Sequence, residues 1–558
     1  MSGWPAEFAA RYRAVGHWRD QTFGRLTRHW ADEYGPREAL VDGEHRISYR
    51  QLAEHADALA IALREHGLQR GDRLLVQLPN CWELLVLLLA CLRAGVAPVL
   101  ALVAHREHEL AYLARHAEVA MIVVPDHWRG HDHRQMAVDL VAGLDRPCLI
   151  GVVGSTRPGL LDLRALLAGS TGPRHVLDRD EPHPDDVAFF LLSGGTTGTP
   201  KMIGRTHNDY EYHVRRTAEI CAVGPETAYL VTLPAAHNFP LCPGILGTLS
   251  KGGRVVLARS PEPVAAFDTI ARERITMTSL VPAIAQRWVE AADARKPDLG
   301  SLRLIQVGGS VLEPGLARKI PAVLGGQLQQ VYGMAEGLIN YTRLDDPDHV
   351  VFATQGRPIS PDDEVLVVDE NDTPVPPGEV GELLTRGPYT IRSYFRAPDH
   401  NRKAFTPDGW YRTGDLVRWH PSGNLVVAGR RKDLINRGGE KISAEEVEDL
   451  VRKLLPVSAM AVVPVPDLTF GERVCLVVVP AAGRPALTLE AVRTALRSYG
   501  VAHYKLPEQL EVLDDLPLTP IGKVDKKALR ARLSTRGSRA DAHEIMTTMA
   551  DARQQPER

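Results

Sequence analysis

The chain of 558 residues contains few cysteines, and they follow no ligand or disulfide pattern. None of the six forms a C-x-x-C pair: they are Cys81, Cys91, Cys148, Cys221, Cys242 and Cys475. Their spacing gives no sign of a zinc knuckle or a disulfide framework and is typical of a protein in a reducing cytoplasm. The cluster His127, His131 and His133 lacks an accompanying ligand pattern, so we expect a solvated loop there rather than a metal site.

The sequence also lacks an excess of basic residues and a long apolar run. Its formal net charge is -3, which gives no sign of a nucleic-acid partner. The longest apolar segment, 84–92, lies between Glu83 and Arg93 and is too short to cross a bilayer. Charged residues interrupt positions 1–28 before an apolar core could form, so we expect no export signal, no membrane partner and a cytoplasmic protein.

A polar loop follows the apolar run 187–192, which predicts a buried strand. The loop reads Ser193-Gly194-Gly195-Thr196-Thr197-Gly198-Thr199-Pro200-Lys201. Its glycines allow close backbone approach, and its hydroxyls and lysine supply the donors and positive charge that a polyphosphate requires. The spacing differs from the usual P-loop, because Pro200 stands where that motif needs glycine and no serine or threonine follows Lys201.

Strands and helices alternate along most of the chain. Expected strands before the loop are 73–78, 97–101 and 120–124, and expected helices are 82–94 and 107–116. After the loop the alternation resumes, with strands expected at 228–233, 254–257, 277–281 and 302–307 and a helix at 244–249. This order is typical of doubly wound, mostly parallel α/β sheets, and we expect two of them.

Beyond Gly356 the pattern changes to short strands separated by turn residues, which predicts a small β-barrel unit; they are 364–368, 381–385 and 425–428. We expect a large N-terminal domain over 1–431 and a small mobile α+β domain over 432–533. Residues 534–558 are charged and poor in large apolar residues, so we expect them to be disordered.

Three further polar clusters suit a reaction of a metal-bound nucleotide. Glu336 lies just past the end of the expected strand 328–331, where ligands of open α/β sheets bind. Asp415 is expected in a turn, and Lys523 in a loop of the other domain. Taken singly, each has a structural alternative: a helix cap, a turn former and a surface charge, respectively.

Together these segments resemble the adenylate-forming superfamily, which comprises acyl- and aryl-CoA synthetases, luciferases and nonribosomal peptide adenylation domains. The matching segments follow the family's order: SGGTTGTPK, YGMAEG, YRTGDL, GRRKDLINRGGEKIS and PLTPIGKVDK. They run from about Ser193 to Lys527, so the resemblance covers both expected domains.

The resemblance implies ATP and Mg²⁺ as cofactors and assigns residues to them. The polar loop would hold the phosphates, Glu336 and Thr196 the metal, and Asp415 and Arg430 the ribose. The adenine would lie against Gly308–Leu312, including Gly309 and Ser310, and against Gln330, Val331, Tyr332, Gly333 and Met334. Lys523 would contact the α-phosphate region during adenylation, and Lys432 would be the hinge that exchanges it for a thiol-delivery face containing Gly438-Gly439.

The segment Pro234–Gly244 narrows the acid that is activated. Its HNFPL core, His237 to Leu241, resembles the stand-alone aryl acid adenylating enzymes of siderophore pathways. The resemblance implies that Asn238 bonds the 2-hydroxyl of a benzoate, that His237 is catalytic, and that the ring slot is completed by Phe239, Cys242, Gly308, Gly309, Val331, Leu338 and Ile339. A neutral Asn238, instead of the aspartate that pairs with an amino acid's ammonium, favours an acid without that charge.

Cys242 and Ile339 favour salicylate over 2,3-dihydroxybenzoate, whose enzymes typically carry serine and valine there. A thiol is a weak donor, and a buried 3-hydroxyl without a good partner costs about 1–3 kcal/mol. A methylated salicylate stays open, and Cys242 could be a simple core residue.

We therefore expect a salicylate-AMP ligase that loads a separate phosphopantetheinylated aryl carrier protein. The alternatives are a 2,3-dihydroxybenzoate-AMP ligase, an aryl-CoA ligase that uses free coenzyme A, and a nucleotide-binding regulator on the same fold.

Overall fold

The computed structural model describes residues 3–169, 175–192, 200–430, 434–437, 440–467, 471–481, 487–499, 501, 503–519 and 522–533. The chain forms two compact units. The first comprises Met1–Leu366, Leu384–Thr413 and Trp419–Val426, and the second comprises Val367–Leu383, Gly414–Arg418 and Val427–Arg558. The expected domain border at 431/432 and the expected disordered tail 534–558 lie outside the described residues.

A seven-stranded sheet forms one half of the first unit, in the order β11-β10-β4-β3-β5-β8-β9. Its strands are β3 Arg73–Val76, β4 Ala97–Leu100, β5 Met121–Pro125, β8 Leu149–Val153, β9 Leu161–Asp162, β10 Val187–Leu192 and β11 Met202–Thr206. All neighbours are parallel except β10 and β11, which pair antiparallel. The expected phosphate loop therefore connects the antiparallel pair at one edge of the sheet.

A nine-stranded sheet forms the other half, in the order β18-β17-β16-β15-β14-β12-β13-β1-β2. Its strands are β1 Glu38–Asp42, β2 His45–Ser48, β12 Ala228–Val231, β13 Arg254–Leu257, β14 Met277–Leu280, β15 Leu304–Gly308, β16 Gln327–Gly333, β17 Ile339–Tyr341 and β18 Arg357–Pro358. Its middle strands are parallel and its edges antiparallel. The prediction of two doubly wound, mostly parallel sheets is confirmed.

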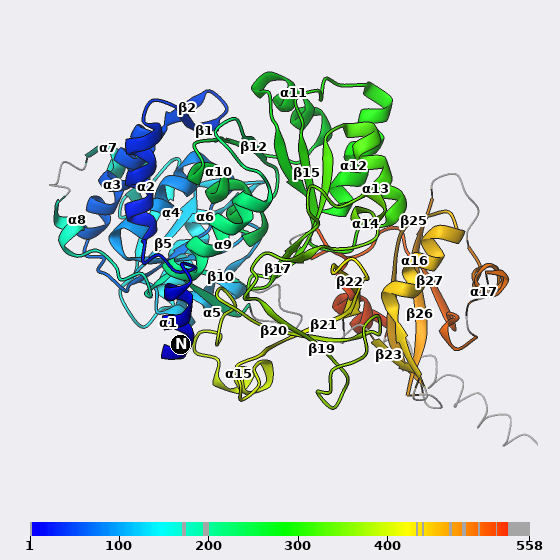
Figure 1. The fold of residues 1–558 in the computed structure, drawn as a ribbon. Helices are drawn as coiled ribbons and strands as arrows, with labels where there is room; N and C mark the ends of the chain where they lie inside the picture. The colour runs from blue at the N-terminus through cyan, green and yellow to red at the C-terminus, as the bar shows by residue number, and fades with distance from the viewer. Residues whose placement is uncertain are drawn as a thin grey trace, which may run out of the picture. The chain divides into compact units, whose positions relative to one another are not determined.

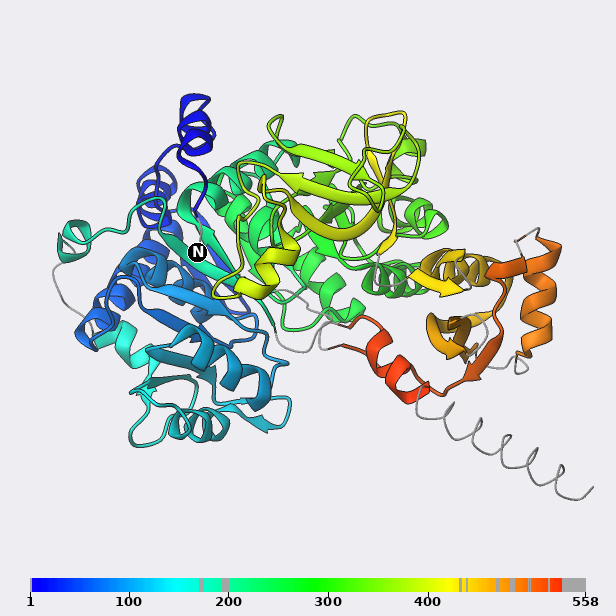
Figure 2. The ribbon, with the colours of Figure 1, turned by 90° about the horizontal axis from the view of Figure 1, so that it is seen from below.

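Helices cover both faces of these sheets, because alternate strand residues point to opposite sides. In β3, Leu74 and Val76 join the core that contains helices α3 and α4, whereas Leu75 joins the core that contains α5 and α6. Figure 2 shows helices on both sides of the blue strands of this sheet. Helices α12 and α13 lie side by side near β15 (Figure 1). The helices of the first unit are α1 Ala6–Ala14, α2 Phe23–Tyr34, α3 Tyr49–Glu65, α4 Trp82–Ala94, α5 Glu107–Ala117, α6 His133–Ala142, α7 Leu163–Gly169, α8 His175–Arg179, α9 His207–Ile220, α10 Gly247–Ser250, α11 Pro263–Glu273, α12 Pro282–Arg295, α13 Pro314–Leu324, α14 Asp348–Val351 and α15 Pro398–Ala404.

The short strands after Gly356 are also confirmed. They form a four-stranded sheet in the order β19-β20-β21-β22, with bounds Glu364–Val368, Gly381–Arg386, Tyr411–Trp419 and Leu425–Arg430. No helix within the described ranges is both long and apolar enough to cross a bilayer.

The C-terminal part of the second unit is an α+β fold. Its sheet has the order β24-β23-β26-β25, with β27 parallel to β26. The bounds are β23 Leu434–Arg437, β24 Glu440–Ser443, β25 Val457–Asp467, β26 Gly471–Pro480 and β27 Gln509–Val512, and the helices are α16 Ala444–Leu454 and α17 Leu489–Ser498. Valines from β25 and β26 fill two separate apolar cores, one of which also contains both helices.

In the first unit, two local expectations were wrong. The helix expected at 244–249 begins earlier, as a π-helix over Pro240–Leu246 that continues into α10. Pro240 and Pro243 lack backbone N–H groups, which removes donors from a regular helical ladder. The expected solvated histidine loop was wrong for His133, which begins α6, is buried, and lies with Nδ1 3.0 Å from Oε1 of Gln77.

Candidate active site

Three segments that carry expected site residues leave the same edge of the nine-stranded sheet. Residues 232–239 follow β12, Gly309 and Ser310 follow β15, and residues 334–338 follow β16. Because β12, β14, β15 and β16 are consecutive parallel neighbours, their carboxyl ends meet at one edge. Open α/β sheets bind their ligands at that edge.

Asn238 is a buried polar residue of the segment Pro234–Gly244, here called the substrate segment, and 6% of its surface is exposed. Its Oδ1 accepts a hydrogen bond of 2.8 Å from the hydroxyl of Tyr210, a fully buried residue of α9. Within the described part of the chain, the Asn238 nitrogen has no hydrogen-bond partner. The amide is therefore held at its oxygen while its N–H groups remain available to a ligand.

Two glycines allow close contacts among the residues expected to line the ring slot. A Cβ at Gly308 would lie 2.5 Å from the Val331 carbonyl oxygen and 3.4 Å from Cζ of Phe239. A Cβ at Gly333 would lie 2.4 Å from Cδ1 of Ile339. These contacts follow from the strand register, in which Gly308 pairs with Val331 and Gly333 with Ile339. The structure thus brings together three of the residues expected to line the ring slot, Phe239, Gly308 and Val331, and places Ile339 against Gly333.

Cys242 and Leu338, two further residues expected to line the slot, are fully buried. Burial raises the pKa of the Cys242 thiol above its ordinary value, so the sulfur stays protonated and uncharged. Cys242 lies in the π-helix, where a Cβ at the neighbouring Gly244 would be 2.0 Å from the Tyr229 ring. Glycine at this position therefore permits the close approach of the π-helix to β12.

His237 is exposed, and its ring is oriented by the adjacent backbone. The Phe239 N–H donates to His237 Nδ1 at 3.2 Å. A neutral ring that accepts at Nδ1 carries its proton on Nε2, which leaves that nitrogen as a donor.

Glu336 is buried and fixed at both its side chain and its backbone. Its Oε1 accepts from the Tyr394 hydroxyl at 2.7 Å, and its carbonyl oxygen accepts from the Ile391 N–H at 2.7 Å. The Tyr394 hydroxyl also lies 3.0 Å from that of Tyr411. Burial and the Glu336 charge raise the Tyr394 pKa, so this hydroxyl stays protonated as a donor.

The exit of the polar loop lies near Glu336. Lys201 Nζ is 5.7 Å from the centre of the Tyr394 ring. Arg205, fully buried in β11, donates to the Ala335 carbonyl at 2.8 Å and pairs with Asp209 at 2.6 Å. Loop residues Ser193 to Thr199, including the expected metal ligand Thr196, lie outside the described residues.

The residues near Glu336 fit a magnesium ion that arrives with a nucleotide. A carboxylate is a hard oxygen ligand, and Mg²⁺ is commonly held by one or two carboxylates together with substrate phosphates and water. Within the described ranges, no group of three or more histidine, cysteine or acidic side chains could hold a metal without such a substrate.

The expected adenine wall is partly exposed. Gly309 and Ser310 are exposed, Tyr332 and Met334 are partly buried, and the Tyr332 carbonyl accepts from Asn340 Nδ2 at 3.0 Å. Gly309 has a φ of 86°, which favours glycine over any other residue.

The remaining expected site residues belong to the second unit, and their roles stay predictions. The turn expected at Asp415 was wrong, because Asp415 is buried within β21. Arg430 ends β22, and its side chain lies outside the description. Lys432 and Gly438-Gly439 lie outside the described residues. Lys523 is exposed in a turn where its N–H donates to Thr519 Oγ1 at 3.2 Å and its carbonyl accepts from the Thr519 N–H at 2.7 Å.

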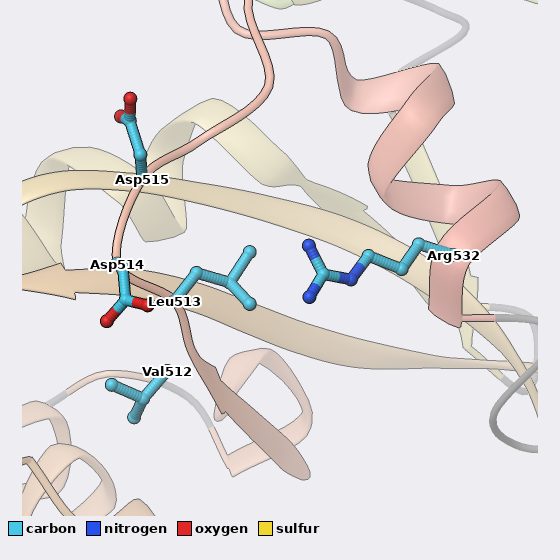
Figure 3. Close-up of a pocket in the computed structure, with 5 residues that line it drawn as sticks. All are labelled: Val512, Leu513, Asp514, Asp515 and Arg532. Carbon is cyan, nitrogen blue, oxygen red and sulfur yellow. The ribbon is translucent and has the colours of Figure 1, made fainter.

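The second unit also has a surface hollow that none of the expected site residues lines. Figure 3 shows Arg532 pointing toward Leu513, while the carboxylates of Asp514 and Asp515 point away from the guanidinium. This divergent arrangement gives no converging set of polar groups for a ligand.

Sequence reasoning missed three residues that organise the site: Arg205, Tyr210 and Tyr394. Tyr210 and Arg205 lie in elements whose buried residues read as core, so their sequence gives no site signal. Tyr394 lies 58 positions from Glu336, and only the fold brings the two together.

The carboxyl edge of a parallel α/β sheet that carries a buried amide, a fixed carboxylate and a neighbouring lysine is suited to binding a nucleotide and a carboxylic acid. Residues 27–395 match the AMP-binding enzyme family, and residues 446–523 match the AMP-binding enzyme C-terminal domain. The chain belongs to this family of adenylate-forming ligases, which places it among enzymes rather than regulators.

Three similar proteins span nearly the whole chain. A Streptomyces sp protein described as salicylyl-CoA synthase / salicylate adenylyltransferase is 58% identical over 533 residues, covering 94% of this chain and 96% of the relative. The 2,3-dihydroxybenzoate-AMP ligase of Bacillus subtilis (strain 168) is 46% identical over 532 residues, covering 95% of this chain and 97% of the relative. The apo structure of Mycobacterium smegmatis MbtA has a TM-score of 0.74 and 42% identity, covering 95% of this chain and 98% of that one.

Proposed function

We propose that this enzyme activates salicylate. It uses ATP to form salicyl-AMP with release of pyrophosphate, and then transfers the salicyl group to the phosphopantetheine thiol of a separate aryl carrier protein. Two relatives whose names specify salicylate and 2,3-dihydroxybenzoate support a 2-hydroxybenzoate as the acid.

The observation that carries this proposal is the buried Asn238 amide beside the narrow wall of Gly308 and Phe239. An amide can hydrogen-bond a neutral 2-hydroxyl group without leaving a charge unpaired. An α-amino acid would bring an ammonium group that needs an anion, and Asn238 supplies none. A flat aromatic acid with a 2-hydroxyl suits both features.

The chain's own residues have distinct roles in the proposed reaction. His237, with its proton on Nε2, would donate toward the acid's carboxylate and orient it, while Lys201 would contact the nucleotide phosphates. Glu336, held by Tyr394, would be the protein ligand of Mg²⁺. When bound, Mg²⁺ would offset the negative charge of the phosphate groups. Lys523 would stabilise the negative charge that develops at the α-phosphate.

Cys242 favours salicylate over 2,3-dihydroxybenzoate. Its buried, protonated thiol is a weak hydrogen-bond donor and acceptor. A hydroxyl at ring position 3 would therefore lose its water without gaining an equivalent partner there. The bare ring carbon of salicylate incurs no such loss.

A second candidate function differs in the thiol that accepts the acyl group. The Streptomyces relative is named both a CoA synthase and an adenylyltransferase, which favours free coenzyme A as an alternative acceptor. The two candidates share the adenylation step and differ only in the partner.

Pyrophosphate exchange across a panel of carboxylic acids tests the adenylation step. We expect ATP-dependent exchange with salicylate, less with 2,3-dihydroxybenzoate, and none with α-amino acids. Exchange driven by an α-amino acid alone would contradict the proposal. Thioester formation with coenzyme A and with a phosphopantetheinylated carrier then compares the acceptors, and rapid turnover with coenzyme A alone would refute the carrier assignment.

A further inference from the structure

Tyr210 contacts Asn238 through its hydroxyl group. It is fully buried in α9, and its hydroxyl donates to Asn238 Oδ1 at 2.8 Å. The edge of its ring meets Phe189 at 4.6 Å between centres, and the Arg205 guanidinium lies 4.9 Å from the ring centre. These neighbours fix the ring, and therefore fix the position of the hydroxyl relative to Asn238.

The Tyr210 hydroxyl acts as a donor in this contact. Burial raises the Tyr210 pKa well above its ordinary value, so the phenol keeps its proton. Within the described part of the chain, Asn238 Oδ1 is the acceptor of that proton. Because the oxygen and nitrogen of a planar amide point in different directions, holding Oδ1 on Tyr210 turns Nδ2 away from it.

We propose that Tyr210 is a positioning residue for substrate specificity, which orients Asn238 so that its NH₂ group, and not its carbonyl oxygen, faces position 2 of the bound aryl acid. This inference rests on the proposed function and adds a selection rule to it. The enzyme would select benzoates whose 2-substituent accepts a hydrogen bond.

A phenol oxygen satisfies this rule. It can donate its own hydrogen to the neighbouring carboxylate of the same molecule and still accept from Asn238. An aromatic amine does not satisfy it, because the nitrogen lone pair is delocalised into the ring and the amine N–H groups would oppose those of the amide. Salicylate and 2-aminobenzoate therefore distinguish the two possible amide orientations.

The test compares wild type with Tyr210→Phe, which removes the hydroxyl and retains the ring. Pyrophosphate exchange is measured with salicylate, 2-aminobenzoate and benzoate, and kcat/KM is determined for each. We expect kcat/KM for salicylate to fall about threefold to tenfold, as for loss of one oriented hydrogen bond. We expect kcat/KM for benzoate to stay within about twofold of the wild-type value. We expect kcat/KM for 2-aminobenzoate to rise relative to that for salicylate, because the freed amide can turn its oxygen to the ligand.

Tyr212→Phe is the matched control. Tyr212 is also fully buried in α9, but its hydroxyl donates to Ser360 Oγ at 2.6 Å and not to the substrate segment. Tyr212→Phe therefore removes the same kind of atom, a tyrosine hydroxyl oxygen, from the same helix. We expect it to leave the ratios of kcat/KM between the three acids unchanged. Thermal unfolding of both variants shows whether either loss is a stability effect.

The outcomes separate the two proposals. If wild type does not use salicylate, or uses benzoate equally well, the proposed function is wrong. The positioning role is wrong, while the function stands, if wild type prefers salicylate but Tyr210→Phe lowers kcat/KM equally for all three acids. The same holds if Tyr212→Phe changes the ratios of kcat/KM between the acids as much as Tyr210→Phe does.

Discussion

The Tyr394 hydroxyl donates a hydrogen bond of 2.7 Å to Oε1 of Glu336, across 58 positions of the chain. Both residues are buried, so the carboxylate has a fixed orientation before any ligand binds. Residues that orient a metal ligand typically affect metal affinity about 10- to 100-fold. The hydrogen bond therefore links a residue outside the recognised motifs to the proposed magnesium ligand.

We predict that Tyr394→Phe raises the Mg²⁺ concentration needed for half-maximal pyrophosphate exchange by about 10-fold or more. Titration of the exchange rate with Mg²⁺ at saturating ATP measures this change. Tyr411→Phe is the control, since it removes the hydroxyl 3.0 Å from that of Tyr394 and retains the Tyr394 hydroxyl that donates to Glu336. Equal Mg²⁺ requirements in wild type and Tyr394→Phe would show that the contact does not support metal binding.

We predict that Asp363 makes the stability of the first unit depend on pH. Burial raises the pKa of this carboxyl from 3.8 to about 7, although Oδ2 accepts from the Tyr389 hydroxyl at 2.6 Å. Within the described residues, its buried Oδ1 has no hydrogen-bond partner. A raised pKa means that the folded state binds the proton more tightly than the unfolded state, so the stabilisation is complete below 3.8 and lost as pH rises to about 7.

Replacing Asp363 with Asn should flatten this dependence, because an amide accepts from Tyr389 without ionising. We expect the urea midpoint of wild type to fall more steeply than that of Asp363→Asn as the pH rises from about 4.5 to about 7. Parallel profiles for the two proteins would mean that Asp363 is not the titrating group.

Gly308 permits the narrow wall of the proposed ring slot. A Cβ there would lie 2.5 Å from the Val331 carbonyl oxygen, a backbone atom that cannot turn away, and 3.4 Å from Phe239 Cζ. Gly308→Ala should therefore displace β15 or Phe239 and raise the KM for the aryl acid by about 10-fold or more, with a smaller effect on the KM for ATP. Gly300→Ala, where the nearest atom would be 3.4 Å away in the Asp298 side chain, is the control. Unchanged KM for the acid in Gly308→Ala would show that this wall does not limit the slot.

Much of the fold was predictable because the strands of both sheets are short apolar runs bounded by polar turns. The expected bounds of β10 and β13 agree with the structure, as do those of the helix expected at 82–94, which is α4. The π-helix was not predictable from apolar spacing, because Pro240 and Pro243 alter its hydrogen bonding without changing the residues that are buried.

The candidate site was predictable only where a motif names its residues. Asn238 and Glu336 stand in recognisable segments, whereas their partners Tyr210 and Tyr394 do not. Each partnership joins residues that are distant in sequence, 28 positions for Tyr210 and Asn238 and 58 for Tyr394 and Glu336. Such contacts depend on how helices and strands pack, which local spacing does not specify.

Cys242→Ser tests the proposed preference between two aryl acids. Serine has nearly the same size but is a stronger hydrogen-bond donor and acceptor, so it can bond a 3-hydroxyl that the thiol cannot. We expect the ratio of kcat/KM for 2,3-dihydroxybenzoate over salicylate to rise by about threefold to tenfold in pyrophosphate exchange. Cys91→Ser, another fully buried cysteine, controls for general effects of the substitution. An unchanged ratio in Cys242→Ser would remove the selectivity argument.

Lys523 has a long cationic side chain and lies in a turn that is closed by two hydrogen bonds between its backbone and Thr519. If this lysine stabilises the charge that develops at the α-phosphate, Lys523→Ala should lower salicylate-dependent pyrophosphate exchange by about 10²- to 10³-fold.

The second half-reaction separates this role from a general loss of folding. Transfer from chemically prepared salicyl-AMP to the thiol does not need the lysine at the α-phosphate, so Lys523→Ala should retain it within about threefold. Lys527→Ala removes another exposed lysine from the same segment and should leave both steps unchanged. Undiminished exchange in Lys523→Ala would overturn the assignment of this lysine, whereas equal loss of both steps would indicate a structural role instead.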